Sequence, residues 1–207
     1  MMATIASLTA MEGRFDDARQ LYADSVALHE ELGLHYLRAC RCLTGAAIES
    51  LAGDSDAAIA ELRSGYDALA QMGERGARST VAAYLALELA EAERFADAEE
   101  FSVIAEELGA LADVVTQAVW RCARALVRAH DGEDEGAERL AREAVELAEG
   151  TDFLELQARA SLTLARVLRS AGSNGEATAL VEDALRAYER KGNRVAAGRV
   201  ADLIEAR

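Results

Sequence analysis

Gly13-Arg-Phe-Asp-Asp-Ala18 is the first of five copies of a short pattern spaced evenly along this chain. The other copies are Gly53-Asp-Ser-Asp-Ala-Ala58, Glu93-Arg-Phe-Ala-Asp-Ala98, Gly132-Glu-Asp-Glu-Gly-Ala137 and Gly172-Ser-Asn-Gly-Glu-Ala177. Their last alanines stand 40, 40, 39 and 40 residues apart in a chain of 207 residues. A period this strict over a whole chain indicates an array of repeated structural units, each packed against its neighbours.

The residues that follow each copy predict a helix with one apolar face. Counted from the last alanine of a copy, apolar or small residues recur at helical offsets, as in Ala137, Leu140, Ala141, Ala144, Val145 and Ala148. Charged residues interrupt this face at Glu61 and Glu106. Each helix then meets a glycine where a left-handed residue is expected to end it, at Gly33, Gly73, Gly109, Gly150 and Gly192.

A second apolar segment precedes each copy of the pattern, as in residues 154–171. Every period therefore predicts two helices joined by a turn, with turns near residues 13, 53, 93, 132 and 172 and about eleven helices in all. A single pair buries only one face, so neighbouring pairs must stack. We expect an all-α, right-handed superhelical solenoid whose first helices line a concave face, with residues 194–206 as a capping helix.

The composition agrees with a helical chain and restricts its partners. Apolar residues make up 51%, aromatic residues 5%, proline is absent and the net charge is −15. Such acidity repels phosphate backbones and anionic lipid heads, so neither nucleic acid nor membrane is an expected partner. No apolar run is long enough to span a bilayer and residues 1–10 do not resemble a secretory signal, so we expect a cytoplasmic location.

The repeated pattern resembles the tetratricopeptide repeat, in which two antiparallel helices cross at a small residue. Phe15 and Phe95 match the aromatic position of the pattern Gly-x-aromatic-x-x-Ala, and the small position is filled by Ala18, Ala58, Ala98, Ala137 and Ala177. The period near 40 residues and the lack of proline resemble the long-helix subclass of bacterial signalling ATPases. The resemblance implies one repeat domain over residues 1–207, with repeats over 1–33, 34–73, 74–112, 113–150 and 151–192 and a capping helix over 193–207.

Three segments resemble the C-terminal repeats of bacterial proteins that join a nucleotide-cyclase domain to an ATPase module. These segments begin at Glu74, Asp113 and Ala187. The resemblance implies a regulatory arm of a larger signalling protein. The chain itself contains neither the cyclase carboxylates nor the ATPase phosphate loop, so we expect either that they lie upstream of it or that the chain is a free-standing relative.

No residue pattern marks a reaction centre, so we assign no catalytic, cofactor-binding or metal-binding residue and expect no enzyme. His29, His35 and His130 are isolated, and Cys40, Cys42 and Cys122 fit neither a disulfide framework nor a zinc site. We expect these cysteines to be buried reduced thiols. Trp120, in the first helix of the fourth repeat, is interpreted as a packing residue.

Two sets of arginines are candidates for a ligand groove. Arg159, Arg166 and Arg169 occupy positions of the fifth repeat that face the groove in tetratricopeptide modules, and a solvated face is the alternative interpretation. The second and fourth repeats place Gly45 with Glu49, and Arg124 with Arg128, where the third and fifth place leucines. That irregularity indicates either a shift of helix register or a charged groove wall formed by Arg121, Arg124 and Arg128.

The regular array without a catalytic motif favours a protein-interaction and regulatory scaffold. Its partner would be a protein, a peptide or another domain of the same signalling protein. The alternative is a small-molecule sensor, as in related ATPase transcription regulators whose helical repeats bind an inducer. A ligand-filled pocket inside the superhelix would favour the sensor. The identity of the partner and the oligomeric state stay open at this point.

Overall fold

A computed structural model of the chain describes residues 1–205 and is helical throughout, with no strand in that range. The predicted all-α fold is confirmed. Twelve helices are described in these residues: α1 (Met2–Met11), α2 (Phe15–Glu31), α3 (His35–Cys40), α4 (Cys42–Ala52), α5 (Ser55–Gln71), α6 (Gly76–Glu91), α7 (Phe95–Leu108), α8 (Val114–His130), α9 (Asp134–Glu149), α10 (Leu154–Ser170), α11 (Asn174–Lys191) and α12 (Arg194–Glu205).

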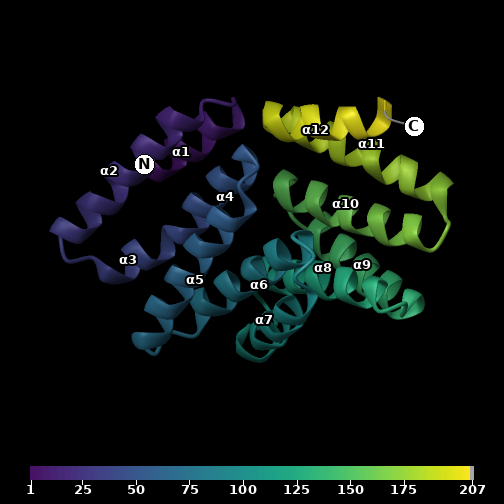
Figure 1. The fold of residues 1–207 in the computed structure, drawn as a ribbon, viewed down its shortest axis with the longest axis horizontal. Coiled ribbons are helices and arrows are strands. Elements are labelled where there is room, and N and C mark those ends of the chain that lie inside the picture. The colour runs from purple at the N-terminus through teal and green to yellow at the C-terminus, as the bar shows by residue number, and fades with distance from the viewer. Residues whose placement is uncertain (206–207) are drawn as a thin grey trace.

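All five predicted turns between paired helices are present. The pairs α1 with α2, α4 with α5, α6 with α7, α8 with α9 and α10 with α11 pack against each other and stack in chain order (Figure 1). Four of the turns contain a glycine with positive φ, at Gly13, Gly53, Gly132 and Gly172. The fifth places Glu93 at φ 59°, a left-handed conformation that is unfavourable for a residue with a Cβ.

Small residues let the paired helices approach each other. The five alanines that end the repeated pattern are fully buried, at 0% exposure: Ala18, Ala58, Ala98, Ala137 and Ala177. Four of them, from Ala58 onward, join leucine and valine side chains in a core that continues along the array, whereas Ala18 belongs to a second, smaller cluster with Ala6, Ala10 and Ile48. The repeat period therefore marks positions where a larger side chain would meet the neighbouring helix.

The number of helices differs from the expected eleven because the first helix of the second repeat is broken. The break lies at Arg41, between α3 and α4. Opposite it, α5 approaches so closely that a Cβ on Gly65 would overlap the Cys42 sulfur and lie 2.9 Å from the Ala39 carbonyl oxygen. Two helix segments meet α5 there in place of one continuous helix.

The same repeat explains why glycine stands where leucine was expected. A Cβ on Gly45 would lie 2.7 Å from the ring of Tyr22, so the tyrosine of α2 fills the space of the missing side chain. The Tyr22 hydroxyl donates a 2.7 Å hydrogen bond to Glu61, the charged residue that interrupts the apolar face of α5. In this repeat, the ring of Tyr22 therefore takes the place that the expected leucine would occupy, and its hydroxyl pairs with Glu61.

The glycines expected to end the second helices divide into two groups. Gly33, Gly73 and Gly192 have positive φ, as predicted. The prediction is wrong for Gly109, which has φ −72°, and for Gly150, which has φ −67°. At Gly109 the reason for glycine is space, because an added Cβ would lie 2.7 Å from the Ala105 carbonyl oxygen.

The array curves so far that its last helix, α12, contacts α1 of the first repeat and α4 of the second. In Figure 1 the purple α1 and the yellow α12 face each other across the top of a ring, and the two helices are in contact. The Arg199 guanidinium of α12 donates hydrogen bonds of 3.1 Å and 2.6 Å to the main-chain carbonyls of Ser50 and Leu51, at the end of α4. The helix expected to cap the array also closes it, while Ala206 and Arg207 of the predicted capping segment lie outside the described residues.

Candidate functional site: a central cavity and an arginine-rich cleft

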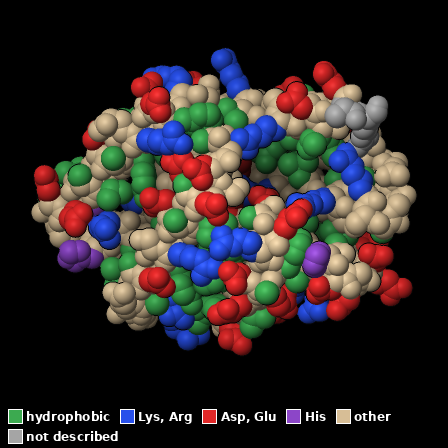
Figure 2. All heavy atoms as spheres, in the orientation of Figure 1, with side chains coloured by type: hydrophobic (Ala, Val, Ile, Leu, Met, Phe, Trp, Pro, Cys, Tyr) green, Lys and Arg blue, Asp and Glu red, His purple; other side chains and the backbone are tan. Residues whose placement is uncertain are grey.

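The ring surrounds a partly open cavity of about 1010 Å³, at the upper limit of the range found for small-molecule sites. The first helices of the repeats contribute most of its lining, as expected for a concave face, and α11, α12, Leu62 of α5 and Phe153 supply the rest. Figure 2 shows this face hollowed near its centre, with acidic and basic side chains beside hydrophobic ones. The site is therefore made by residues from both ends of the chain.

Much of the cavity wall is apolar. Aliphatic side chains from α4, α8, α10 and α12 supply it, among them Leu43, Leu51, Val115, Leu126, Leu162, Val200 and Leu203. Apolar residues reach the cavity because the first helices present apolar side chains on two sides, toward the paired helix and toward the ring interior. Such a wall favours the apolar part of a ligand.

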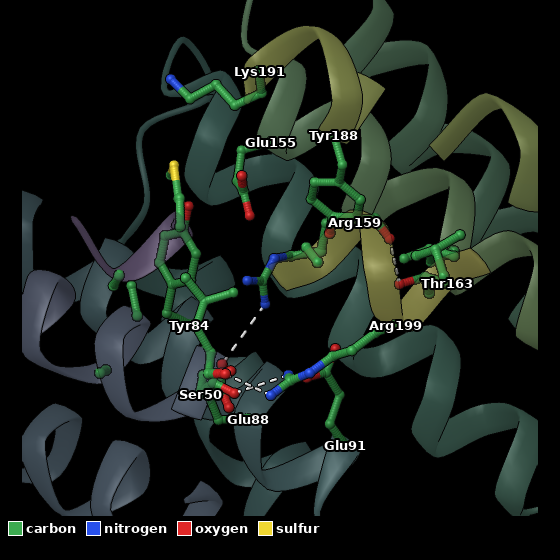
Figure 3. A pocket seen from close by; sticks show the side chains of 18 of the residues that line it. Ser50, Tyr84, Glu88, Glu91, Glu155, Arg159, Thr163, Tyr188, Lys191 and Arg199 are labelled. Atoms are coloured by element: carbon green, nitrogen blue, oxygen red, sulfur yellow. Dashed lines mark hydrogen bonds and ion pairs between the residues drawn. The ribbon is translucent and has the colours of Figure 1, made fainter. Parts of the chain in front are cut away.

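Arg159 of α10 and Glu88 of α6 meet inside this cavity (Figure 3). A nitrogen of the Arg159 guanidinium lies 3.7 Å from a Glu88 carboxylate oxygen, and the two side chains are 19% and 6% exposed. The guanidinium also lies 5.9 Å from the centre of the Tyr84 ring. Thus a buried pair of opposite charges joins helices from the third and fifth repeats.

Burial governs the protonation of this group of residues. Loss of solvent, followed by repulsion from Glu91, raises the pKa of Glu88 to about 7 even though Arg159 lies beside it. Burial opposes the charge of Arg159, but attraction to Glu91 and Glu88 outweighs it and raises the pKa of the guanidinium, which stays charged. Burial also raises the pKa values of Tyr84 and Tyr188, so both hydroxyls stay protonated.

The remaining charged side chains give the cavity an excess of cations. Five cationic side chains line it, namely Arg159, Arg166, Arg169, Lys191 and Arg199, against the three carboxylates Glu88, Glu91 and Glu155. Arg199 is held by the carbonyls of α4, and Glu155 accepts a 3.3 Å hydrogen bond from Asn193. Within residues 1–205, neither a hydrogen bond nor an ion pair engages the charged ends of Arg166 and Lys191. A cavity with a net positive lining thus lies inside a chain of net charge −15.

The second predicted set of arginines lies elsewhere, in a cleft of about 490 Å³ between α7, α8 and α9. The guanidinium groups of Arg121 and Arg124 lie 4.2 Å and 4.5 Å from the centre of the Trp120 ring, which is 3% exposed. The packing role expected for Trp120 agrees with this burial. The two sets of arginines are therefore not parts of one groove.

Each arginine of this cleft is paired with a glutamate. Arg121 binds Glu143 at 3.0 Å, Arg124 binds Glu106 at 2.6 Å and Arg128 binds Glu133 at 3.0 Å. Glu106 is one of the charged interruptions noted in the sequence, and its contact ties α7 to α8. These pairs join neighbouring helices and engage the three predicted arginines with carboxylates, and Glu143 also pairs with Arg139, the fourth arginine of the cleft.

Sequence reasoning placed Arg159, Arg166 and Arg169 on the groove side, and all three line the cavity, but it missed several other lining residues. Glu88 could have been found, since it is the only charged residue between Val81 and Ala90. Lys191 could have been noticed as the only lysine in the chain. Nothing in the sequence pointed to Tyr84 or Tyr188, which the fold brings to Arg159 from two helices (Figure 3).

The histidines and cysteines contribute nothing to this cavity. His130 stacks on Phe95 with ring centres 3.9 Å apart. Cys42 and Cys122 are buried free thiols, and burial raises their pKa values to about 12 and about 11, whereas Cys40 is a free, half-buried thiol. Within residues 1–205 the fold gathers no three side chains of His, Cys, Asp or Glu that could hold a metal ion, and no helix there is long and apolar enough to cross a membrane.

Comparison with solved structures identifies the fold. The chain is similar to BtubC (BKLC) from P. vanneervenii, with a TM-score of 0.64 and 19% identity over 92% of this chain and 79% of that chain. It is also similar to a putative kinesin light chain of Podosopora anserina with nearly identical TPR-like repeats, with a TM-score of 0.59 and 19% identity over 93% and 95% of the two chains. A variant of the latter gives a TM-score of 0.60.

No protein-family profile matches the chain, and neither does any curated protein. The likeness to solved structures therefore establishes a helical solenoid of TPR-like repeats and nothing about the ligand.

Proposed function

We propose that this chain is a non-catalytic regulatory module whose ligand binds in the central cavity. The observation that carries the proposal is the closed array, in which Arg199 joins α12 to the end of α4 and which surrounds about 1010 Å³ of largely apolar space. A cavity of that size with a few convergent polar groups is a typical binding site.

The dimensions favour a small molecule over a protein segment as the ligand. The contacts of α12 with α1 and α4 narrow the concave face, which leaves less room for an extended peptide or a folded domain than an open array would. A small molecule fits in the space that remains. Of the two functions considered from the sequence, the small-molecule sensor is thus better supported by the geometry than the peptide-binding scaffold.

Protein interaction remains a second candidate because one end of the ring exposes apolar side chains. They lie at the end of α2, on α3 and after α5, with exposures of 37% to 61%: Leu28, Leu32, Leu34, Tyr36, Leu37 and Met72. Apolar patches of this kind often mark sites of protein contact.

The proposed parent is a signalling protein with cyclase and ATPase domains. This proposal rests on the three sequence segments that begin at Glu74, Asp113 and Ala187, and sequencing the coding region next to this segment of the gene tests it.

The main proposal is tested by filling the cavity. Leu162→Trp adds an indole to the cavity wall, and Ala179→Trp adds the same group to the exposed side of α11. We expect a low-molecular-weight extract of the expression host to raise the melting temperature of the wild type and of Ala179→Trp, but not that of Leu162→Trp. Equal responses of all three proteins would exclude the cavity as the site.

The second candidate has its own test. A Leu32→Glu, Leu34→Glu variant should lose a protein partner while keeping the response to the small-molecule extract. Loss of the partner only in the cavity variant would contradict docking at the apolar patch.

A further inference from the structure

We propose that the central cavity binds a small amphipathic organic carboxylate, with its carboxylate on Arg159 and its apolar body against the aliphatic wall. This inference rests on the proposed function and names the class of its ligand. It follows from three features of the cavity, which are its charge, the free donors of Arg159 and the position of the apolar wall.

The lining charges favour an anion. Cations outnumber carboxylates in the lining, although acidic residues outnumber basic ones by 37 to 22 in the whole chain. The carboxylate that lies closest to Arg159 is Glu88, whose burial favours its neutral form. When Glu88 is protonated, no ionised carboxylate of residues 1–205 lies within 4 Å of the Arg159 guanidinium, and Glu91 attracts it only from a greater distance. An anionic ligand would supply a close partner.

Arg159 has the geometry that a carboxylate needs. A guanidinium presents five N–H donors in a planar fork that matches two carboxylate oxygens. The one ion pair of Arg159 within residues 1–205 is the 3.7 Å contact to Glu88, which is longer than a hydrogen bond. The guanidinium is nevertheless largely withdrawn from solvent, with 19% of its side chain exposed, so a charge-assisted hydrogen bond there is stronger than one at the surface.

The apolar wall accounts for the rest of the ligand. Leu43 and Leu51 of α4 and Leu126 of α8 line the same cavity as Arg159. Burying an alkyl or aryl group against such side chains contributes about 25 cal/mol per Å² of apolar surface. An inorganic anion would gain nothing from this wall, and an uncharged or cationic amphiphile would leave the guanidinium unpaired. The two features together favour an amphipathic organic anion, and a carboxylate is the simplest anion that matches the planar fork of donors.

Probes of equal chain length and different charge test the ligand class. Isothermal titration calorimetry of the full chain with decanoate, 1-decanol and decylammonium should show decanoate binding at least about tenfold more tightly than the other two, as expected for a charge-assisted hydrogen bond. Equal affinities for decanoate and 1-decanol would overturn the anionic assignment while leaving the cavity as an apolar site.

The role of Arg159 is tested with two variants, neither of which leaves a buried carboxylate without a cation. Because Arg159→Gln alone would leave Glu88 buried without a cation, the comparison is between Glu88→Gln and the double variant Glu88→Gln, Arg159→Gln. We expect Glu88→Gln to bind decanoate and the double variant to lose about tenfold in affinity without a change for 1-decanol. Arg142→Gln, on the outer side of α9 among Glu138 and Glu176, is the control and should bind as the wild type does. Equal decanoate affinity of the single and double variants would overturn the proposal.

The chain offers a direct probe of where the ligand binds, because Lys191 is its only lysine and lines the cavity. Reductive methylation with ¹³C-formaldehyde labels this amine and the N-terminal amine, and the Lys191→Arg variant, which lacks the first signal, assigns the two. Decanoate should shift the Lys191 signal and leave the N-terminal signal in place. Binding by calorimetry without a Lys191 shift would place the ligand outside the cavity and overturn both proposals. Failure of all three probes to bind would overturn the ligand class alone, since the extract experiment tests the cavity independently.

Discussion

The guanidinium of Arg199 in α12 donates a 2.6 Å hydrogen bond to the carbonyl of Leu51, which precedes it by 148 residues in the chain. The acceptor lies in the last turn of α4, where main-chain carbonyls have no partner within the helix, and a cation there also complements the helix dipole. One side chain thereby caps α4 and fastens the last helix to the second repeat. In an open array each repeat contacts only the repeats next to it. This contact joins the end of the array to its second repeat and so closes a ring.

Removing this contact should loosen the ring without unfolding the repeats. For Arg199→Ala we expect a loss of about 1 kcal/mol in the free energy of unfolding, since the arginine is exposed, and an increased radius of gyration by small-angle X-ray scattering. Arg194→Ala, at the exposed start of α12, is the matched control. An unchanged radius of gyration in Arg199→Ala would mean that the packing of α12 on α1 closes the ring without it.

The left-handed residue in the third turn offers a stabilising substitution. Glu93 has φ 59° at the place where the other four turns have glycine. Because a Cβ costs roughly 1 to 2 kcal/mol in this conformation, Glu93→Gly should raise the stability by about 1 kcal/mol. Gly132→Ala is the reverse change, at φ 79° with open space around the added Cβ, and should lower it by a similar amount. Urea denaturation measures both, and a destabilised Glu93→Gly would show that the Glu93 side chain has contacts worth more than the strain.

The alanines at the helix crossings should not accept larger side chains. Ala137→Leu and Ala177→Leu each insert an isobutyl group at a position with 0% exposure, so we expect losses of about 1 to 3 kcal/mol. Ala179→Leu places the same group on the exposed side of α11 and should be nearly neutral. Thermal melts that are equal for all three variants would contradict close packing at the anchor positions.

The sequence predicted the repeats because each turn and each helix crossing requires a particular type of residue. A tight turn needs a residue that tolerates positive φ, as Gly13 does, and a crossing needs a small side chain such as Ala18. Both residue types, the turn glycine and the small residue at the crossing, recur with the period of the structure. The break at Arg41 has no counterpart in the other repeats, and it lies opposite Gly65, where α5 approaches α3 and α4 closely.

The closed ring could not be predicted, since the acceptors of Arg199 are main-chain carbonyls that every residue possesses. The residues that line the cavity were predicted in part. Arg159 was identified from its position in the repeat, but its partner Glu88 comes from a helix two repeats earlier and its role depends on burial. The sequence does mark Glu88, because it is the only charged residue between Val81 and Ala90, but the spacing of the repeats does not connect it with Arg159.

Protonation of Glu88 should make the stability of the chain depend on pH. Burial raises its pKa from 4.5 to about 7, so the folded state binds this proton more tightly than the unfolded state does. The resulting stabilisation is fully present below about pH 4.5 and is lost as the pH rises through about 7. The groups that face Glu88 are Ser50 from α4, Glu91 from its own helix and Arg159 from α10, of which Arg159 stays charged throughout.

Glu88→Gln should remove this dependence, because the amide resembles the protonated acid and cannot ionise. Relative to the variant, the wild type should lose on the order of 1 to 3 kcal/mol between about pH 5 and about pH 8, as measured by urea denaturation at each pH. Glu146→Gln, on the exposed side of α9, removes a carboxylate without changing the cavity and should keep the wild-type profile. Parallel profiles for the wild type and Glu88→Gln would mean that Glu88 is ionised in the folded state at pH 5, so that Arg159 already has its anionic partner and the cavity has less need of an anionic ligand.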